Sequence, residues 1–308
     1  MKIFSEVETD AAAGLRIAEE LSRIRANLSG AKAIVAIASA KGGVGKSALT
    51  ANLAAAFALA GRKVGVIDAD LNSPGIIMML GMKPPLKNLL ASEWLEPGAG
   101  PLGLRVASSN LLADGDPPPI SFLEDDAATI PTAASNGRGP VELDYAATLR
   151  RLLGQTRFGA LDLLLIDLAP GLDPLHRIAK LVPLSGVILV SQPSELAVRA
   201  LGKAIELATH AHIPITGVVE NMVGFNCEGC HSVRPLTPQG DLASLAREKG
   251  VPILARLPFD SRFAEACDHG VLFVREYNET PLGKQLIALA HAVDAALDAH
   301  HLTQVPAT

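Results

Sequence analysis

Residues 33–47 read AIVAIASAKGGVGKS, and this stretch decides the fold. Its aliphatic first half, residues 33–39, predicts a buried β-strand, and a helical pattern over residues 46–59 follows the glycines directly. A strand, a glycine-rich turn and a helix in this order are typical of a phosphate-binding loop. The glycines let successive backbone N–H groups face an anion, and the helix adds its positive N-terminal end.

Two side chains at the end of the loop match phosphate and metal chemistry. Lys46 places a positive charge against the β- and γ-phosphates of a nucleotide, and the Ser47 hydroxyl is a ligand for Mg²⁺. A glycine-rich turn that merely starts a helix is disfavoured by the full Gly-Lys-Ser ending. We therefore predict that ATP and Mg²⁺ bind here. The expected nucleotide contacts are Lys41, Gly42, Gly43, Val44, Gly45, Lys46, Ser47 and Ala48.

Carboxylates follow two further predicted strands. Residues 63–67 lead into Asp68 and Asp70, and the hydrophobic run LDLLLI (161–166) leads into Asp167. Because the carboxyl ends of parallel strands meet at one edge of a sheet, these side chains are expected in the ligand-binding crevice. Asp167 fits a Walker B aspartate that holds Mg²⁺ directly or through water. Simple capping of a strand end is the alternative for each.

The rest of the chain alternates short aliphatic runs with helical patterns. This rhythm predicts an α/β fold, a doubly wound, mostly parallel sheet flanked by helices. We expect an N-terminal helical extension over residues 1–32 and a single ATPase domain over residues 33–308. Residues 110–140 are interpreted as a mobile surface loop, and residues 221–238 as a loop with a Cys-x-x-Cys pair. The other aliphatic runs are residues 104–107, 186–190, 215–220 and 253–257.

The composition indicates which partners and which cellular compartment to expect for the protein. The 308 residues carry a net charge of −5, which gives no indication of a nucleic-acid partner. Three cysteines, an odd number, argue against a disulfide framework. No stretch approaches the roughly 18 apolar residues of a membrane span, and the N-terminus lacks a signal-peptide core. We expect a cytoplasmic protein that binds neither membrane nor nucleic acid.

The run KGGVGKS (41–47) resembles the deviant Walker A motif of the MinD/ParA/Mrp-type ATPases. In that family the early lysine reaches across a dimer interface to the partner's nucleotide. The resemblance therefore implies an ATP-sandwich homodimer with Lys41 at the interface, although an exposed loop lysine would look the same. It implies catalytic roles for Lys41, Lys46 and Asp70, with Asp70 positioning the attacking water. It also implies that Asp68 helps at the metal.

The segment ENMVGFNCEGC (220–230) resembles the ENMSxFxCPxC stretch of the Mrp/ApbC-type iron–sulfur cluster carrier ATPases. Two neighbouring stretches agree, VGVIDADLNSPGIIMMLGM (64–82) and VPILARLPFDSRFAEACDHG (251–270). The resemblance covers most of the chain from residue 33 to about residue 274. It implies that Asn221 contacts adenine, with a plain turn residue as the alternative.

The cysteine pair supplies two thiolates, whereas a four-coordinate site requires four. Two copies of the chain would provide Cys227 and Cys230 twice, so a [4Fe–4S] cluster that bridges a homodimer is the leading interpretation. A shared structural Zn²⁺ is the main alternative, and a redox pair or an incidental pair is disfavoured. Cys267 lies in a helical pattern and is interpreted as a small buried hydrophobe. His231 adjoins the pair and could join a metal site.

These features together predict a homodimeric ATPase that binds an iron–sulfur cluster and transfers it to apo iron–sulfur proteins. Hydrolysis is expected to be slow, because residues 169–174 (APGLDP) replace the family's PPGTGD after Asp167. The alternative is a MinD/ParA-like positioning or regulatory ATPase without a cluster. MinD-like proteins end in a basic amphipathic helix that binds lipid. The amphipathic segment 281–301 holds only one lysine, Lys284, which favours a helix packed on the domain.

Overall fold

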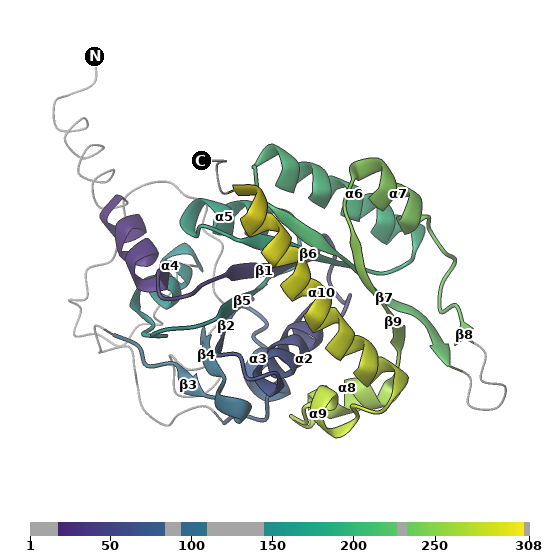
Figure 1. Ribbon diagram of the computed structural model, residues 1–308, viewed down its shortest axis with the longest axis horizontal. Coiled ribbons are helices and arrows are strands. Elements are labelled where there is room, and N and C mark those ends of the chain that lie inside the picture. The colour runs from purple at the N-terminus through teal and green to yellow at the C-terminus, as the bar shows by residue number, and fades with distance from the viewer. Residues whose placement is uncertain (1–17, 84–93, 110–144, 227–232, 305–308) are drawn as a thin grey trace, which may run out of the picture.

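The computed structural model describes residues 18–83, 94–109, 145–226 and 233–304. In this part of the chain, a nine-stranded sheet lies between two layers of helices (Figure 1). The predicted α/β architecture with a mostly parallel sheet is confirmed. The expected loop at 110–140 and residues 1–17 of the N-terminal extension lie outside the described residues.

The strands run in the spatial order β3-β4-β2-β5-β1-β6-β7-β8, and β9 pairs with β7. β3 and β8 are antiparallel to their neighbours, and the other pairings are parallel. The strand bounds are β1 Ile34–Ala38, β2 Val64–Ala69, β3 Gly98–Ala99, β4 Arg105–Ser108, β5 Leu163–Leu168, β6 Gly186–Ser191, β7 Ile215–Asn226, β8 Val233–Arg234 and β9 Ile253–Phe259. Strands β1, β2, β5 and β6 are buried along their whole length, as expected for aliphatic runs covered on both faces.

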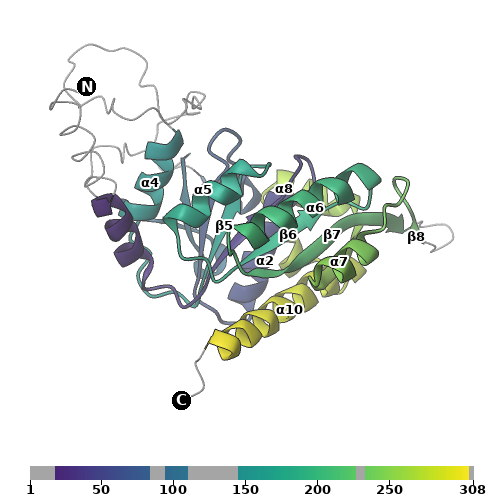
Figure 2. The same ribbon diagram turned by 90° about the horizontal axis from the view of Figure 1, so that it is seen from above.

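The helices on the two faces of the sheet pack into two separate hydrophobic clusters. One face is covered by a helix at residues 18–28 and by α4 Tyr145–Gln155, α5 Asp173–Leu181, α6 Glu195–His210 and α7 Leu242–Lys249. The other is covered by α2 Lys46–Leu59, α3 Ile76–Met79, α8 Ser261–Asp268, α9 Phe273–Glu276 and α10 Pro281–Gln304. Figure 2 shows α5 and α10 on opposite sides of the sheet.

The amphipathic C-terminal segment forms the long helix α10, which packs on the domain. Leu286 and Val293 are fully buried in the second cluster, so the apolar stripe faces the protein core. Among the described helices, none has the length and apolarity needed to cross a bilayer. The interpretation of this segment as a packed helix is therefore confirmed.

Strand β7 is longer than the sequence predicts. The aliphatic run ends at Glu220, and residues 221–238 are expected to form a loop, yet the strand continues to Asn226 and pairs with β8. The backbone pairing of Phe225 with Arg234 stabilises this extension, which no pattern of aliphatic residues indicates. The β7–β8 hairpin lies at the opposite end of the molecule from the helix at 18–28 (Figures 1 and 2).

Candidate functional site

The glycine-rich loop lies between β1 and α2, at the carboxyl edge of the parallel strands. Gly43 and Gly45 adopt left-handed backbone conformations, with φ of 76° and 83°. Gly45 is the residue before the first turn of α2, and no described side chain caps that turn. Because the first N–H groups of a helix lack intrahelical acceptors, this loop and turn have the backbone geometry of the predicted phosphate site.

Lys46 and Asp167 form the centre of the site. The Lys46 Nζ lies 2.8 Å from Asp167 Oδ1, and both side chains are buried. The Ser47 hydroxyl donates to Asp167 Oδ2 over 2.6 Å, and the Thr50 hydroxyl lies 2.9 Å from Oδ1. The sequence analysis missed Thr50, although its place one helical turn after Lys46 puts it on the same helix face.

Asp68 lies beside Asp167, since the two residues are partners in the pairing of β2 with β5. Its Oδ1 accepts from the Asp70 N–H over 3.2 Å and its Oδ2 from the Ile76 N–H over 3.1 Å. Burial raises the pKa of Asp68 well above its usual value, and the charge of Asp167 raises it further. The backbone donors and Lys46 oppose this shift without cancelling it.

The donor set and its charge fit a magnesium ion. In the described part of the site, the two buried carboxylates of Asp68 and Asp167 face one buried cation, Lys46. A divalent cation near them would compensate the excess negative charge that raises the pKa of Asp68. Carboxylate and hydroxyl oxygens, here with Ser47, are the ligands that Mg²⁺ prefers.

Asp70 follows β2 and is half-buried. Burial raises its pKa, Lys46 lowers it, and Asp167 raises it. The buried Tyr145 hydroxyl donates to the Ala69 carbonyl over 3.0 Å, which fixes the backbone between Asp68 and Asp70. Burial and the charge of Asp70 raise the pKa of Tyr145 to about 12, so the phenol stays protonated. No sequence motif marks Tyr145.

Two amide side chains contact the outer side of the loop. Asn221 Nδ2 donates to the Val44 carbonyl over 2.9 Å, and Gln192 Nε2 donates to the Gly43 carbonyl over 3.2 Å. The Asn221 Oδ1 accepts from the Met222 N–H over 3.0 Å. Each polar atom of the Asn221 side chain therefore binds one protein group, and the second N–H of Nδ2 and the second lone pair of Oδ1 are the groups with which the predicted adenine contact would be made. Gln192 was not predicted, because no motif includes it.

The other predicted loop residues surround this centre. Lys41 is half-exposed, and its carbonyl accepts from the Ser39 hydroxyl over 2.9 Å. Gly42 is exposed, Val44 is buried and Ala48 lies half-buried in the first turn of α2. The structure therefore brings the predicted nucleotide residues together with Asp68, Asp70 and Asp167 at one sheet edge.

The cysteines separate into two groups. Cys227, Cys230 and His231 lie outside the described residues. Cys267 is buried in α8, and Asn52 Nδ2 lies 3.8 Å from its sulfur. Burial raises the pKa of the Cys267 thiol to about 11, which agrees with its interpretation as a small hydrophobe.

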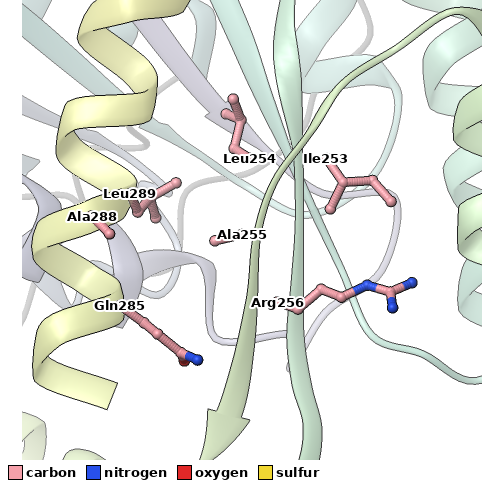
Figure 3. A pocket seen from close by; sticks show the side chains of 7 residues that line it. All are labelled: Ile253, Leu254, Ala255, Arg256, Gln285, Ala288 and Leu289. Atoms are coloured by element: carbon pink, nitrogen blue, oxygen red, sulfur yellow. The ribbon is translucent and has the colours of Figure 1, made fainter. Parts of the chain in front are cut away.

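A separate open groove of about 470 Å³ lies between β9 and α10 (Figure 3). Its lining contains none of the loop residues or strand-end carboxylates. Arg256 extends away from α10, and its Nε lies 2.9 Å from the buried Glu220 carboxylate. The groove is therefore distinct from the phosphate site. It is lined by Ile253, Leu254, Ala255, Arg256, Gln285, Ala288 and Leu289.

Solved structures with similar folds include nucleotide-binding proteins. A nucleotide-binding protein of Archaeoglobus fulgidus, solved with ADP, is 31% identical with a TM-score of 0.66, and the match covers 86% of this chain and 96% of that one. The cell division ATPase MinD of Pyrococcus furiosus is 23% identical with a TM-score of 0.57, over 85% of this chain and 98% of MinD. The second likeness shows the shared fold alone.

Sequence comparison gives the family. Iron–sulfur cluster carrier proteins of Saccharolobus solfataricus and Methanocaldococcus jannaschii are 33% and 36% identical over 274 and 269 residues. These matches cover 88% and 84% of this chain, and 86% and 83% of the relatives. A family model described as ParA, NUBPL iron-transfer P-loop NTPase, matches residues 30–294. The chain therefore belongs to the NUBPL-type, ParA-related family of iron-transfer P-loop NTPases.

Proposed function

We propose that the protein is a homodimeric ATPase that carries an iron–sulfur cluster to apo iron–sulfur proteins in the cytoplasm. One observation carries this proposal: β7 contacts the phosphate loop at Asn221 and continues to Asn226, directly before Cys227. A single strand thus leads from the nucleotide site to the cysteine pair. This arrangement supports a protein in which nucleotide turnover governs what the cysteines hold.

In this proposal, ATP binds with its phosphates against the N–H groups of residues 42–48. Lys46 leaves Asp167 for the β- and γ-phosphates, and Ser47 and Asp167 hold Mg²⁺ with help from Asp68. The ion, when bound, neutralises charge that develops on the transferred phosphoryl group. Asp70 orients the attacking water, and Tyr145 keeps the backbone at Asp70 in place. We expect slow turnover, because residues 169–174 differ from the family pattern.

The homodimer is supported by what the described surface exposes. The half-exposed Lys41 lies beside the exposed Gly42, so its ammonium group can extend from the loop toward a second copy. In β7, just after β8 and in β9, the side chains of Phe225, Leu236 and Phe259 are exposed by 36%, 45% and 37%. Exposed apolar side chains of this size favour association with another protein surface.

The cluster is cargo in this proposal. Cys227 and Cys230 from two copies give the four thiolates of a [4Fe–4S] cluster. Binding at a two-fold interface makes release simple, because separation of the copies halves the ligand set. A Zn²⁺ ion on the same thiolates is the competing occupant.

Anaerobic reconstitution with iron and sulfide tests the proposal. The wild-type protein is compared with a Cys227→Ala/Cys230→Ala double variant and with Cys267→Ala, the matched control. We expect a broad absorption band near roughly 400 nm and about four irons per dimer in the wild type and in Cys267→Ala. The double variant should lose both. Zinc or no metal in the wild type would refute the carrier function and leave a MinD/ParA-like positioning or regulatory ATPase.

A further inference from the structure

The outer carbonyls of the phosphate loop are connected to the start of the β7–β8 hairpin by three side chains. Gln192 holds the Gly43 carbonyl, and Asn221 holds the Val44 carbonyl. The same Gln192 Nε2 lies 3.1 Å from the Met222 sulfur, and the Asn221 Oδ1 accepts from the Met222 N–H. These contacts form a closed circuit of loop, amides and methionine. We call Gln192, Asn221 and Met222 the clamp.

The clamp leaves little free space against the loop. A Cβ atom added to Gly45 would lie 2.5 Å from Asn221 Nδ2 and 3.4 Å from the Met222 methyl carbon. Only glycine allows this approach at that position. The backbone at Gly45 is therefore packed directly against Asn221 and Met222.

The hairpin begins at an irregular point of β7. Met222 has a φ of 59°, a left-handed conformation that costs free energy in a residue other than glycine. The pairing with β9 shifts register here: Asn221 pairs with Leu257 and Phe225 with Phe259, so β7 residues 222–224 face only Pro258. Bulges of this kind re-aim a strand. We define the arm as β7 residues 222–226 together with β8.

We propose that the clamp transmits the nucleotide state of the phosphate loop to the arm that leads to the cysteine pair. Gln192, Asn221 and Met222 act as positioning residues. They hold the arm in one orientation while Lys46 remains on Asp167, and they shift it when the loop closes on phosphate. This inference rests on the proposed function, in which the arm carries the cargo ligands.

The clamp contains no charged group, so it can act only through the positions of its hydrogen-bonded atoms. Its contacts join amide, carbonyl and thioether groups, and none of them is ionised. The Glu220–Arg256 ion pair lies one residue before Asn221, but Glu220 pairs with Arg256 rather than with the loop. The transmitted signal is therefore a displacement of hydrogen-bonded groups.

Hydrogen–deuterium exchange of the full-length, metal-free protein tests the clamp. Amide exchange of the arm is followed without nucleotide and with Mg²⁺ and a non-hydrolysable ATP analogue. In the wild type we expect the nucleotide to change arm exchange by about threefold or more. In Gln192→Ala and Met222→Ala this response should vanish, while the affinity for the analogue stays within about threefold. Gln192→Glu, which cannot donate to Gly43, should behave like Gln192→Ala.

Gln285→Ala is the matched control, because Gln285 is exposed on α10 and contacts no loop residue. It should keep the full wild-type response. A wild-type response in Gln192→Ala or Met222→Ala would overturn the proposal, and so would a wild-type arm that ignores bound nucleotide. Iron plays no part in this measurement. If the protein loads a cluster but the exchange of the arm does not respond to nucleotide, only the role of the clamp is refuted. If the arm responds but no cluster is loaded, only the carrier function is refuted.

Discussion

Lys46 and Asp167 form a buried ion pair at the point where a nucleotide and its metal would bind. The 2.8 Å contact joins a lysine exposed by 6% to an aspartate exposed by 0%. The pair is held further by Ser47 and Thr50. In the proposed function, nucleotide binding would exchange these partners: phosphate would take the place of Asp167 at the ammonium group, and Mg²⁺ would take the place of Lys46 at the carboxylate.

The first prediction concerns this exchange. Lys46→Met should lower the free energy of unfolding of the nucleotide-free protein by about 3 kcal/mol, because it leaves the Asp167 carboxylate buried without its cation. Nucleotide affinity should fall about 100-fold, since the phosphates also lose the charge. Denaturant unfolding and calorimetric titration with ADP measure the two effects.

A double variant distinguishes the effect of Lys46 on folding stability from its effect on nucleotide affinity. Lys46→Met/Asp167→Asn removes the stranded charge and should recover most of the lost stability without recovering nucleotide binding. Equal ADP affinity in Lys46→Met and the wild type would contradict the assignment of Lys46 to the phosphate site.

The second prediction compares two glycines of the loop. Gly43→Ala should lower the free energy of unfolding by about 1 kcal/mol. The positive φ of Gly43 is the source of this loss, since the added methyl group meets nothing within 4 Å. Gly45 has a similar φ, and its substitution by Ala adds a 2.5 Å contact with Asn221 Nδ2. Gly45→Ala should therefore lower the free energy of unfolding by about 3 kcal/mol. Thermal unfolding of both variants measures the difference. Equal losses would show that Asn221 moves aside freely.

The third prediction is a pH dependence at the start of β5. Asp162 accepts from the Lys32 ammonium and the Lys63 N–H, each over 2.8 Å, and these contacts lower its pKa from 3.8 to about 2. The stabilisation is present above pH 3.8 and is lost as the pH falls toward 2. Because Lys32 is 78% exposed, solvent screening keeps the effect small.

Asp162→Asn should therefore lower the melting temperature by about 2 °C at pH 7. The difference from the wild type should shrink as the pH falls from 4 toward 2. Melting curves at several pH values test this, with exposed Asp268→Asn as the control. A difference that stays constant across that range would indicate a role of Asp162 other than its charge.

The fourth prediction concerns cysteine reactivity. Cys267 should resist iodoacetamide in the folded protein at pH 8, because the residue is 3% exposed and burial raises the pKa of its thiol to about 11. It should react readily in urea, as mass spectrometry of the peptide with residues 261–270 would show. Fast labelling of Cys267 in the folded state would mean that α8 opens from the domain.

The sequence predicts the fold well, because aliphatic runs buried on both faces and a glycine turn leave few alternatives. Helix α2 begins at Lys46 as expected, and Asp68 and Asp167 lie side by side because their strands are neighbours. The contacts made by Gln192 and Tyr145 could not be predicted. They depend on which strand ends lie beside the loop, and a single glutamine or tyrosine carries no periodic signal.

The length of β7 has a consequence for how the two ends of the protein communicate. From Asn221 to Asn226 a fully extended strand would cover about 17 Å, at about 3.3 Å per residue, and the bulge at Met222 makes the actual span shorter. A separation of that order exceeds the Debye length of about 8 Å at physiological ionic strength, beyond which interactions between solvent-exposed charges are largely screened. In the proposed function, a change at the nucleotide site would therefore reach the end of β7 as a change in the position of its backbone.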